Sequence, residues 1–358
     1  MNILTRYLAR QIYVATFGVL LAFLGLFAFF DLLNELDNVG RDGGYELYHA
    51  MIYVALILPG RVYELIPIAV LIGSLYALTN LARNSEITVM RASGLSTARA
   101  LALLGSIGSV FVALTFVFGE FIAPPAERAA QQWRLIATRS AVSQDLASGL
   151  WVRDGKLFVN VGVLKPDRSL EHVRLYEFDD QYALVSISDA RQGAFAGAKG
   201  WRLTEVARTR FLGDATEVEA LDEIYWQSEL TPEVLSVLMV VPERMSVRTL
   251  YKYVSHLRDN GQKSERYEIA LWKKLAYPLA ALVMLALALP FAYTHDRMGG
   301  VSLKVFLGVM LGVAFHLLNG LFSNLGVINA WPPVVAALTP SLLFLCAAGT
   351  MLWWFERR

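Results

Sequence analysis

Long apolar runs without charged residues limit the fold of this chain more than any other feature. Residues 12–30 and 65–81 are two such runs, and residues 305–355 contain no Asp, Glu, Lys or Arg. About 20 apolar residues cross the hydrocarbon core of a bilayer as a helix, because a helix satisfies its own backbone hydrogen bonds there. The sequence therefore predicts a polytopic α-helical membrane protein.

Six spans are predicted, three on each side of a long polar stretch. They lie at residues 12–30, about 51–81, 100–119 and 275–294, with two more inside 305–355. The last run is too long for one crossing, and segment 326–333, rich in Gly, Asn and Pro, divides it. The second span extends across the charged Arg61 and Glu64, and Pro59 and Pro67 are expected to bend it.

The polar stretch between the two sets of spans reads as a β-rich insert. The chain then has three parts, which are residues 1–123 with spans one to three, the insert at 124–265, and residues 266–358 with spans four to six. Apolar residues alternate from Leu157 to Val163 after the turn pair Asp154-Gly155, as they do in half-buried strands. Similar short patterns occur at 174–178 and 201–203. Several such strands predict a small sandwich or a jelly roll.

The distribution of basic residues predicts the orientation in the membrane. With both termini in the cytoplasm, the short inside segments hold Arg6, Arg10, Arg83, Arg91, Arg99, Arg297, Lys304, Arg357 and Arg358. The short outside loops hold Arg41 alone, beside several carboxylates. Because Lys and Arg concentrate in cytoplasmic loops, this bias predicts that the insert lies outside the cytoplasm.

The loop between spans two and three has the marks of a short helix at 84–95. Asn84 or Ser85 can cap it, Glu86 suits its first turn, and Gly94 is placed to end it. Its apolar residues are Ile87, Val89, Met90 and Leu95. Two interpretations stay open, which are docking of this helix in a groove on a cytoplasmic partner, and an interfacial helix on lipid head groups.

Charged residues near the outer ends of the spans are candidates for anion contacts. Arg61 and Glu64 are three residues apart and share a helix face, so they form either a mutual ion pair or part of an anion-contacting surface. Arg134, just beyond span three, extends this basic surface. Guanidinium groups suit phosphate because they donate two parallel hydrogen bonds.

Other polar and small residues in the spans have structural interpretations. Glu120 at the outer end of span three is interpreted as an interfacial residue. His316 and Asn319 share a face of span five and are expected to make interhelical hydrogen bonds. Gly308 and Gly312 form a small-xxx-small pair, which favours a helix-packing face.

Motifs of enzymes and of metal or nucleotide sites are absent from the sequence. It contains no G-x-x-x-x-G-K-[ST] phosphate loop, no H-E-x-x-H and no G-x-S-x-G, and its one cysteine, Cys346, lies in an apolar run. The net charge of +1 argues against a nucleic-acid-binding protein. We therefore expect neither catalysis nor a resident cofactor or metal in this chain.

Three motifs give the chain a resemblance to a known family. They are Arg83-Asn84-Ser85-Glu86-Ile87-Thr88-Val89-Met90-Arg91-Ala92-Ser93-Gly94, Gly119-Glu120-Phe121-Ile122-Ala123-Pro124 and Gly149-Leu150-Trp151-Val152-Arg153-Asp154-Gly155. With the arrangement of three spans, an insert and three spans, the chain resembles the lipopolysaccharide-export permease family (LptF/LptG) over its whole length. The second and third motifs are more similar to the LptG branch.

The resemblance implies a permease subunit of an ABC transporter in a bacterial inner membrane, with a periplasmic β-jelly roll. Such a subunit extracts lipopolysaccharide from the outer leaflet and passes it to a periplasmic bridge. Its implied partners are an LptF-like permease, an LptB-like ATPase dimer that binds the ATP, and an LptC-like protein. The alternatives are a permease of another ABC exporter, and a membrane receptor or scaffold that senses an extracytoplasmic ligand.

The resemblance also implies roles for particular residues. Segment 84–95 is then the coupling helix that receives the motion of the ATPase. The residues expected to take part in this coupling are Arg83, Ser85, Glu86, Met90 and Arg91. Those expected to contact lipid phosphates are Arg61 and Arg134.

Overall fold

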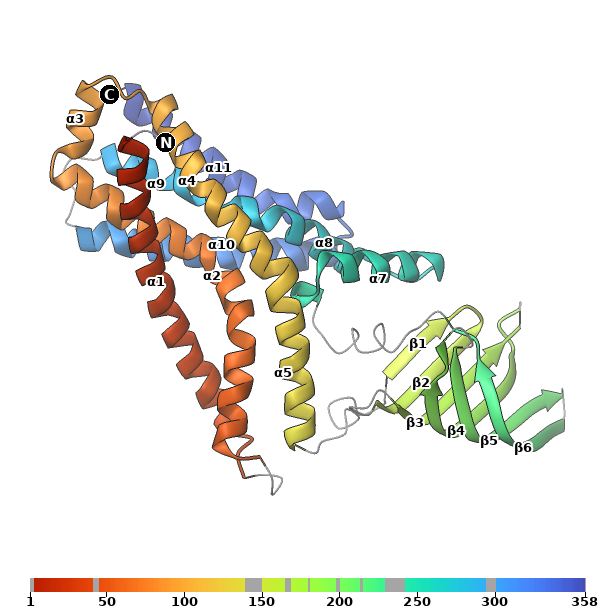
Figure 1. Ribbon diagram of the computed structural model, residues 1–358. Helices are drawn as coiled ribbons and strands as arrows, with labels where there is room; N and C mark the ends of the chain where they lie inside the picture. The colour runs from red at the N-terminus through yellow and green to blue at the C-terminus, as the bar shows by residue number, and fades with distance from the viewer. Residues whose placement is uncertain are drawn as a thin grey trace.

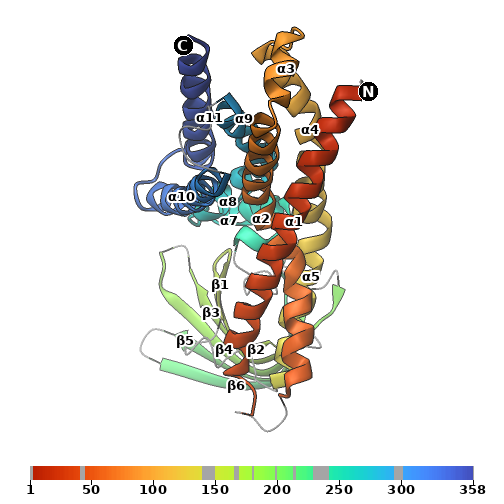
Figure 2. The same ribbon diagram turned by 90° about the vertical axis from the view of Figure 1, so that its left-hand side faces the viewer.

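The computed structural model describes residues 3–40, 45–138, 150–164, 169–179, 181–197, 200–212, 215–228, 242–293 and 301–357. Within these ranges, six helices are long and apolar enough to cross a membrane, as the sequence predicts. The helices form an elongated bundle, with a β-sheet at one end and the two ends of the chain at the other (Figure 1). A second view confirms this separation (Figure 2). The expected fold, a polytopic helical protein with a β insert, is confirmed.

The first two spans are long antiparallel neighbours. They are α1 (Ile3–Leu36) and α2 (Leu47–Arg83), and α2 runs through both of its prolines without a break. The two helices approach closely at Gly73, where an added Cβ would lie 2.5 Å from the Cα of Thr16. A glycine is required there because any side chain would overlap the backbone of α1.

The third span continues well beyond the predicted end at residue 119. Helix α4 (Thr97–Val117) passes through a π-helical turn, Phe118–Ile122, into α5 (Ala123–Thr138). At this turn an added Cβ on Gly119 would lie 2.5 Å from the ring of Tyr63, so the glycine lets α2 and the turn pack together. Such π-helical turns insert one extra residue per turn and are frequent at functional sites.

The C-terminal spans pack against α2 and against one another. The fourth span consists of α8 (Glu265–Ala276), a 3₁₀ turn at Tyr277–Leu279 and α9 (Ala280–Tyr293), and it is followed by α10 (Val301–Ile328) and α11 (Pro333–Arg357). Gly308 and Gly312 of α10 face Leu75 and Ile68 of α2, so the predicted helix-packing face is confirmed. Much of the buried core of the bundle comes from α2 and α9. The other spans are largely exposed, and their exposed surface is apolar.

The insert forms one six-stranded antiparallel sheet. Its strands are β1 (Leu150–Asp154), β2 (Leu157–Leu164), β3 (Leu170–Phe178), β4 (Leu184–Phe195), β5 (Trp201–Leu212) and β6 (Ala215–Trp226). Each described strand pairs with the next along the chain. This meander differs from the strand order of a jelly roll, in which Greek-key crossings place non-consecutive strands side by side.

The sheet encloses its own apolar core. Val159 and Val161 of β2 are buried on one face, as their alternation predicts. On the same core, the rings of Trp201 and Trp226 stack with centroids 6.2 Å apart. Trp226 also donates a hydrogen bond of 3.0 Å to Asp154, which joins the last strand to the first. The sheet is therefore curled, and one tryptophan connects its two edges.

Candidate functional site

The short helix between spans two and three lies where the sequence predicts it, as α3 (Glu86–Ala92). Gly94, with a φ of +97°, ends it, and the Leu95 N–H donates to the Met90 carbonyl at 3.1 Å, as in a Schellman motif. Ser85 occupies the N-cap position but makes no capping hydrogen bond with its side chain. Its φ of +62° differs from the extended backbone of ordinary N-caps. The position of the cap is therefore as predicted, but the expected hydrogen bond from the helix amides to its side chain is not formed.

The apolar side chains of α3 pack inward instead of forming a free docking surface. Ile87 is buried, and Met90 and Leu95 pack against the same core of the helical bundle. Three of the four apolar residues of segment 84–95 therefore hold this short helix to the spans. Val89 is the large apolar side chain of α3 that stays exposed.

Polar residues surround the exposed face of α3. Glu86 is partly buried and accepts a hydrogen bond of 2.9 Å from the hydroxyl of Tyr7 in α1. Arg91 is exposed and lies over the ring of Tyr293, with its Cζ 4.6 Å from the ring centroid. Arg83 is exposed at the end of α2. The structure therefore brings this part of the predicted coupling set together at one end of the bundle.

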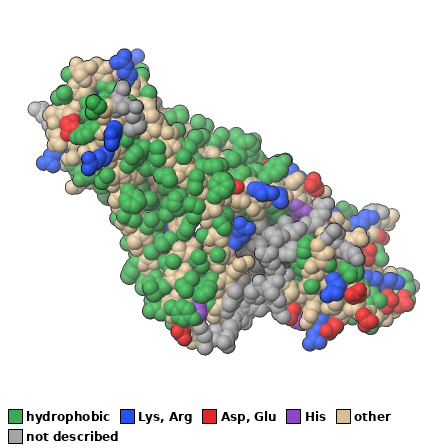
Figure 3. Space-filling model, in the orientation of Figure 1, with side chains coloured by type: hydrophobic (Ala, Val, Ile, Leu, Met, Phe, Trp, Pro, Cys, Tyr) green, Lys and Arg blue, Asp and Glu red, His purple; other side chains and the backbone are tan. Residues whose placement is uncertain are grey.

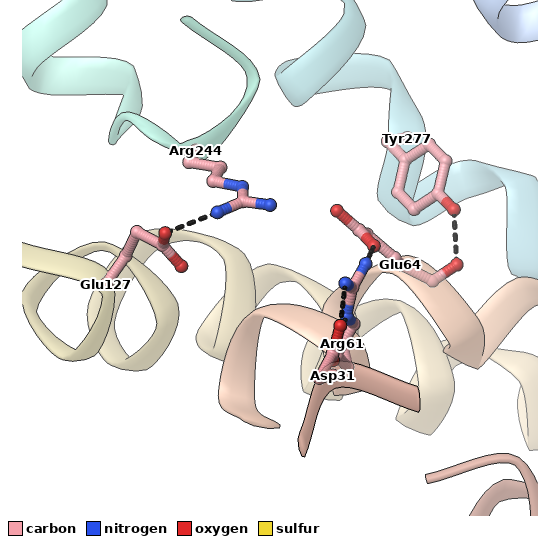
Figure 4. Close-up of polar contacts among 6 residues, drawn as sticks. All are labelled: Asp31, Arg61, Glu64, Glu127, Arg244 and Tyr277. Carbon is pink, nitrogen blue, oxygen red and sulfur yellow. Dashed lines mark hydrogen bonds and ion pairs between the residues drawn. The ribbon is translucent and has the colours of Figure 1, made fainter. Parts of the chain in front are cut away.

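A second cluster lies toward the opposite end of the bundle, where Arg61 is held between two carboxylates. Its guanidinium donates to both carboxylate oxygens of Asp31 in α1, at 2.7 and 3.0 Å, and to Glu64 at 3.2 Å (Figure 4). The ion pair with Glu64 is one of the two sequence interpretations. The contact with Asp31 is not evident from the sequence, because it joins residues of two different helices.

Arg134, the other predicted phosphate contact, is paired as well. Its Nε lies 3.3 Å from the buried carboxylate of Glu35, which also accepts a hydrogen bond of 2.8 Å from the hydroxyl of Tyr45. The Arg134 guanidinium lies over the ring of Tyr53, with its Cζ 5.5 Å from the ring centroid. Both predicted arginines therefore lie on the same side of the bundle, and their role toward lipid stays a prediction.

The outer end of span three is connected to the segment that follows the sheet. Glu127 of α5 forms an ion pair of 2.5 Å with Arg244 (Figure 4). Glu120 accepts hydrogen bonds from the backbone amides of Val247 at 2.7 Å and Arg248 at 3.4 Å. These amides belong to the first turn of the helix that begins at Val247. Glu120, interpreted from the sequence as an interfacial residue, therefore lies in span three and helps to cap the N-terminus of that helix.

That capped helix, α7 (Val247–Asp259), connects the spans to the sheet. At its C-terminal end, the Asn260 side chain accepts a hydrogen bond of 3.0 Å from the Gly155 amide in the turn between β1 and β2. At the same end it is bound to α8, because Arg258 in its last turn and Glu268 form an ion pair of 2.8 Å. The helix therefore has polar attachments at both ends, with two of them at its C-terminal end.

The surface of the spans is largely apolar, as a bilayer requires. Figure 3 shows hydrophobic side chains over the helices, with Lys and Arg near the α3 end and charges of both signs over the sheet. A hollow of about 770 Å³ between α1, α2 and α4 is lined almost wholly by apolar side chains, among them Phe17, Leu21 and Phe111. Such a hollow suits acyl chains or another apolar helix.

The polar residues His316 and Asn319 of span five line a separate cavity. Asn319 donates a hydrogen bond of 3.0 Å to the carbonyl of Phe315 in its own helix, so the expected interhelical bond is wrong for this residue. Its neighbour His316 lines the same cavity.

Comparison with known proteins places the whole chain beside one group of membrane proteins. The family model described as lipopolysaccharide export system permease LptF/LptG matches residues 6–357. The chain is 30% identical over 358 residues to the lipopolysaccharide export system permease protein LptG of Haemophilus influenzae, covering 100% of this chain and 99% of that protein. It is also 30% identical over 360 residues to LptG of Escherichia coli K12, with the same coverage.

Proposed function

This chain belongs to the lipopolysaccharide export system permease family LptF/LptG, and we propose that it is the LptG-like permease subunit of an ABC transporter. In this role it extracts lipopolysaccharide from the outer leaflet of the inner membrane and passes it to a periplasmic bridge. The observation that carries the proposal is the match of the family over residues 6–357, which includes the spans and the insert alike.

The proposed orientation has both termini in the cytoplasm and the sheet in the periplasm. The N-terminal end, the C-terminal end and α3 lie at one end of the bundle, and the sheet lies at the other (Figure 1). The exposed Arg83 and Arg91 belong to the α3 end, which supports a cytoplasmic location for it. An LptB-like ATPase dimer is then the proposed partner at α3, and it supplies the ATP hydrolysis that this chain has no phosphate loop to perform.

The packing of α3 gives a physical route for coupling. Ile87 and Met90 are packed on the core of the spans, so a force on the exposed side of α3 moves the bundle with it. On the outer side, we propose that an LptF-like permease and an LptC-like protein cover apolar surface of the spans. Their pairing with this chain completes a cavity for the lipid, in which acyl chains meet apolar side chains and Arg61 and Arg134 lie near the phosphates.

The test of coupling uses Glu86. We expect Glu86→Lys to weaken co-purification of the ATPase and to abolish lipopolysaccharide release from proteoliposomes, because it reverses the charge of a carboxylate on the docking side. Glu217→Lys, in the exposed strand β6, makes the same charge change far from α3 and serves as the control. Tyr7→Phe removes the hydrogen bond to Glu86 and is expected to have little effect. Normal ATPase binding and export with Glu86→Lys contradict the proposal.

The test of phosphate contact uses both arginines. Arg61→Gln with Arg134→Gln removes both charges without placing new carboxylates beside Asp31 and Glu35. We expect the double variant to lose most of the stimulation of ATPase activity by lipopolysaccharide. Unchanged stimulation would show that these arginines act only as partners of the carboxylates.

A further inference from the structure

A polar cavity of about 250 Å³ lies between α2, α8 and α10. Its polar lining includes Lys273, Lys274, His316, Asn319, Ser323 and Asn324. A second, smaller hollow adjoins it on the other side of Lys274 and is lined also by Arg61 and Arg244. Charged side chains of both signs from separate parts of the chain therefore line the two hollows on either side of Lys274.

Among the basic side chains that line the two hollows, Lys274 is the one whose buried nitrogen makes no hydrogen bond to a described residue. Its residue is 5% exposed, and its Nζ is buried without a hydrogen bond to any described group. The ring of Tyr63 lies beside it, with its centroid 5.1 Å from the Nζ, and the carboxylates of Glu120 and Glu64 act on the ammonium group electrostatically without a hydrogen bond. An ammonium group buried without an acceptor costs several kcal/mol, so this site is far more stable with an anion in it.

The carboxylates that line the two hollows are largely engaged elsewhere. Glu64 binds Arg61 at 3.2 Å, and Glu127 binds Arg244. Glu243 is the remaining carboxylate in the linings, and its side chain is exposed. Glu243 acts on Lys273, whereas the carboxylates that act on Lys274 are Glu120 and Glu64, neither of which bonds to its Nζ. The substitutions described below separate a pairing with these carboxylates from the binding of an external anion.

The other groups of the cavity are donors or can act as donors. Lys273 has its Nζ 3.5 Å from the hydroxyl of Ser323, and the amide of Asn319 and the imidazole of His316 lie in the same lining. Two ammonium groups with neutral donors around them suit a phosphate group, which offers several strong acceptor oxygens. Arg61 and Arg134, by contrast, are already bound to carboxylates in this structure.

We infer that the cavity between α2, α8 and α10 binds a phosphate group of an anionic amphiphile, with Lys274 as its principal cation and Lys273 as a second contact. This inference rests on the proposed function, because it gives the exported lipid a phosphate site that is distinct from the two arginines. It predicts that discrimination between phosphorylated and dephosphorylated lipid depends on Lys274.

The experiment measures equilibrium binding of lipopolysaccharide, and of enzymatically dephosphorylated lipopolysaccharide, to the complete transporter in nanodiscs. We expect Lys274→Met to weaken binding of the phosphorylated lipid about tenfold, which corresponds to about 1.4 kcal/mol, and to leave binding of the dephosphorylated lipid unchanged. Lys263→Met changes an exposed lysine outside the cavity and is expected to bind like wild type. Lys273→Met, at a half-buried position, is a second variant that tests the same cavity.

Glu64→Gln and Glu120→Gln, which remove the two carboxylates that act on Lys274, decide between an internal partner and an external phosphate. If an external phosphate is the ligand, each variant binds phosphorylated lipid as tightly as wild type or more tightly, because a charge that repels the phosphate has been removed. If either variant instead reproduces the loss seen in Lys274→Met, the lysine pairs with that carboxylate and the inference is overturned. Equal loss for both lipids, or no loss in either lysine variant, overturns it too.

Inorganic phosphate at millimolar concentration distinguishes the source of the phosphate group. Competition with the phosphorylated lipid in wild type, absent in Lys274→Met, supports a site that accepts phosphate from either source. Absence of competition, with lipid discrimination still lost in the variant, supports a site that takes phosphate only as part of an amphiphile. A wild-type transporter that binds no lipopolysaccharide contradicts the proposed function, whereas normal binding by both lysine variants contradicts this inference alone.

Discussion

The ion pair between Asp31 and Arg61 is expected to be among the stronger polar contacts between α1 and α2. It has two hydrogen bonds of 2.7 and 3.0 Å, and the side chains of Arg61 and Asp31 are 23% and 12% exposed. We propose to measure its coupling energy with Asp31→Asn, Arg61→Met and the double variant. A double-mutant cycle removes the separate costs of the two substitutions and leaves the energy of the pair.

The expected magnitude lies between two known limits. Breaking a buried pair by removing one partner costs about 3–5 kcal/mol, whereas an exposed pair contributes about 0–1 kcal/mol. Here the pair is mostly buried, but Glu64 at 3.2 Å still neutralises Arg61 when Asp31 is lost. We therefore expect each single variant to lose about 2–3 kcal/mol, the double variant to lose less than their sum, and the coupling energy to be about 2 kcal/mol.

The measurement is equilibrium unfolding of the purified protein in detergent micelles. The same chain offers a matched control in the cross-strand pair of Arg191 and Glu205, at 3.1 Å, whose side chains are 70% and 61% exposed. Its coupling energy is expected to stay below about 1 kcal/mol. If the coupling of Asp31 and Arg61 is no larger than that of the control, the geometry does not strengthen this pair and the reasoning is refuted.

Three further substitutions test other contacts. Gly73→Ala should destabilise the protein by about 1–3 kcal/mol in the same unfolding assay, because the added Cβ would overlap the backbone of Thr16. Unchanged stability would mean that α1 and α2 can move apart without a loss of folding free energy. Trp226→Phe removes the hydrogen bond to Asp154 and part of a buried ring, so we expect the free energy of unfolding to fall by about 2 kcal/mol. A decrease of less than about 0.5 kcal/mol, the limit for surface substitutions, would show that the two sheet edges stay together without this hydrogen bond. Glu120→Gln should speed amide hydrogen exchange in the first turn of α7. The reason is that a neutral amide stabilises a helix N-terminus by about 0.3–1 kcal/mol less than a carboxylate. An unaltered exchange rate would exclude the capping role.

Local features of the structure follow well from the sequence. The spans appear wherever an apolar run is long enough, because the bilayer leaves few other structures open to such a run. Gly94 ends α3 as expected, because the left-handed backbone needed at that position favours glycine. The pair Gly308 and Gly312 also packs as its spacing predicts.

Contacts between residues that are far apart in the sequence could not be predicted from its apolar and charged patterns. Glu127 and Arg244 are 117 residues apart in the chain, so only the packing of α5 against the segment after the sheet reveals that they pair. For the same reason Met90 could be seen to be apolar, but its direction into the core depends on how α3 rests on the spans. The strand order of the insert could not be predicted either, because alternating apolar residues indicate where strands occur but not which strands pair.

The attachments of α7 give the protein a lever arm between membrane and sheet. A helix of 13 residues is about 20 Å long, since each residue adds about 1.5 Å. One end is fixed by Glu120 at the π-helical turn of span three, and the other is tied by Asn260 to the first hairpin of the sheet. Because Arg258 at this far end is also paired with Glu268 of α8, α7 moves together with span four, and a tilt of the two by about 10° would displace the far end of α7 by about 3 Å, the size of one strand residue. Small angular changes in the spans can therefore become translations of the sheet comparable to a full step along a strand.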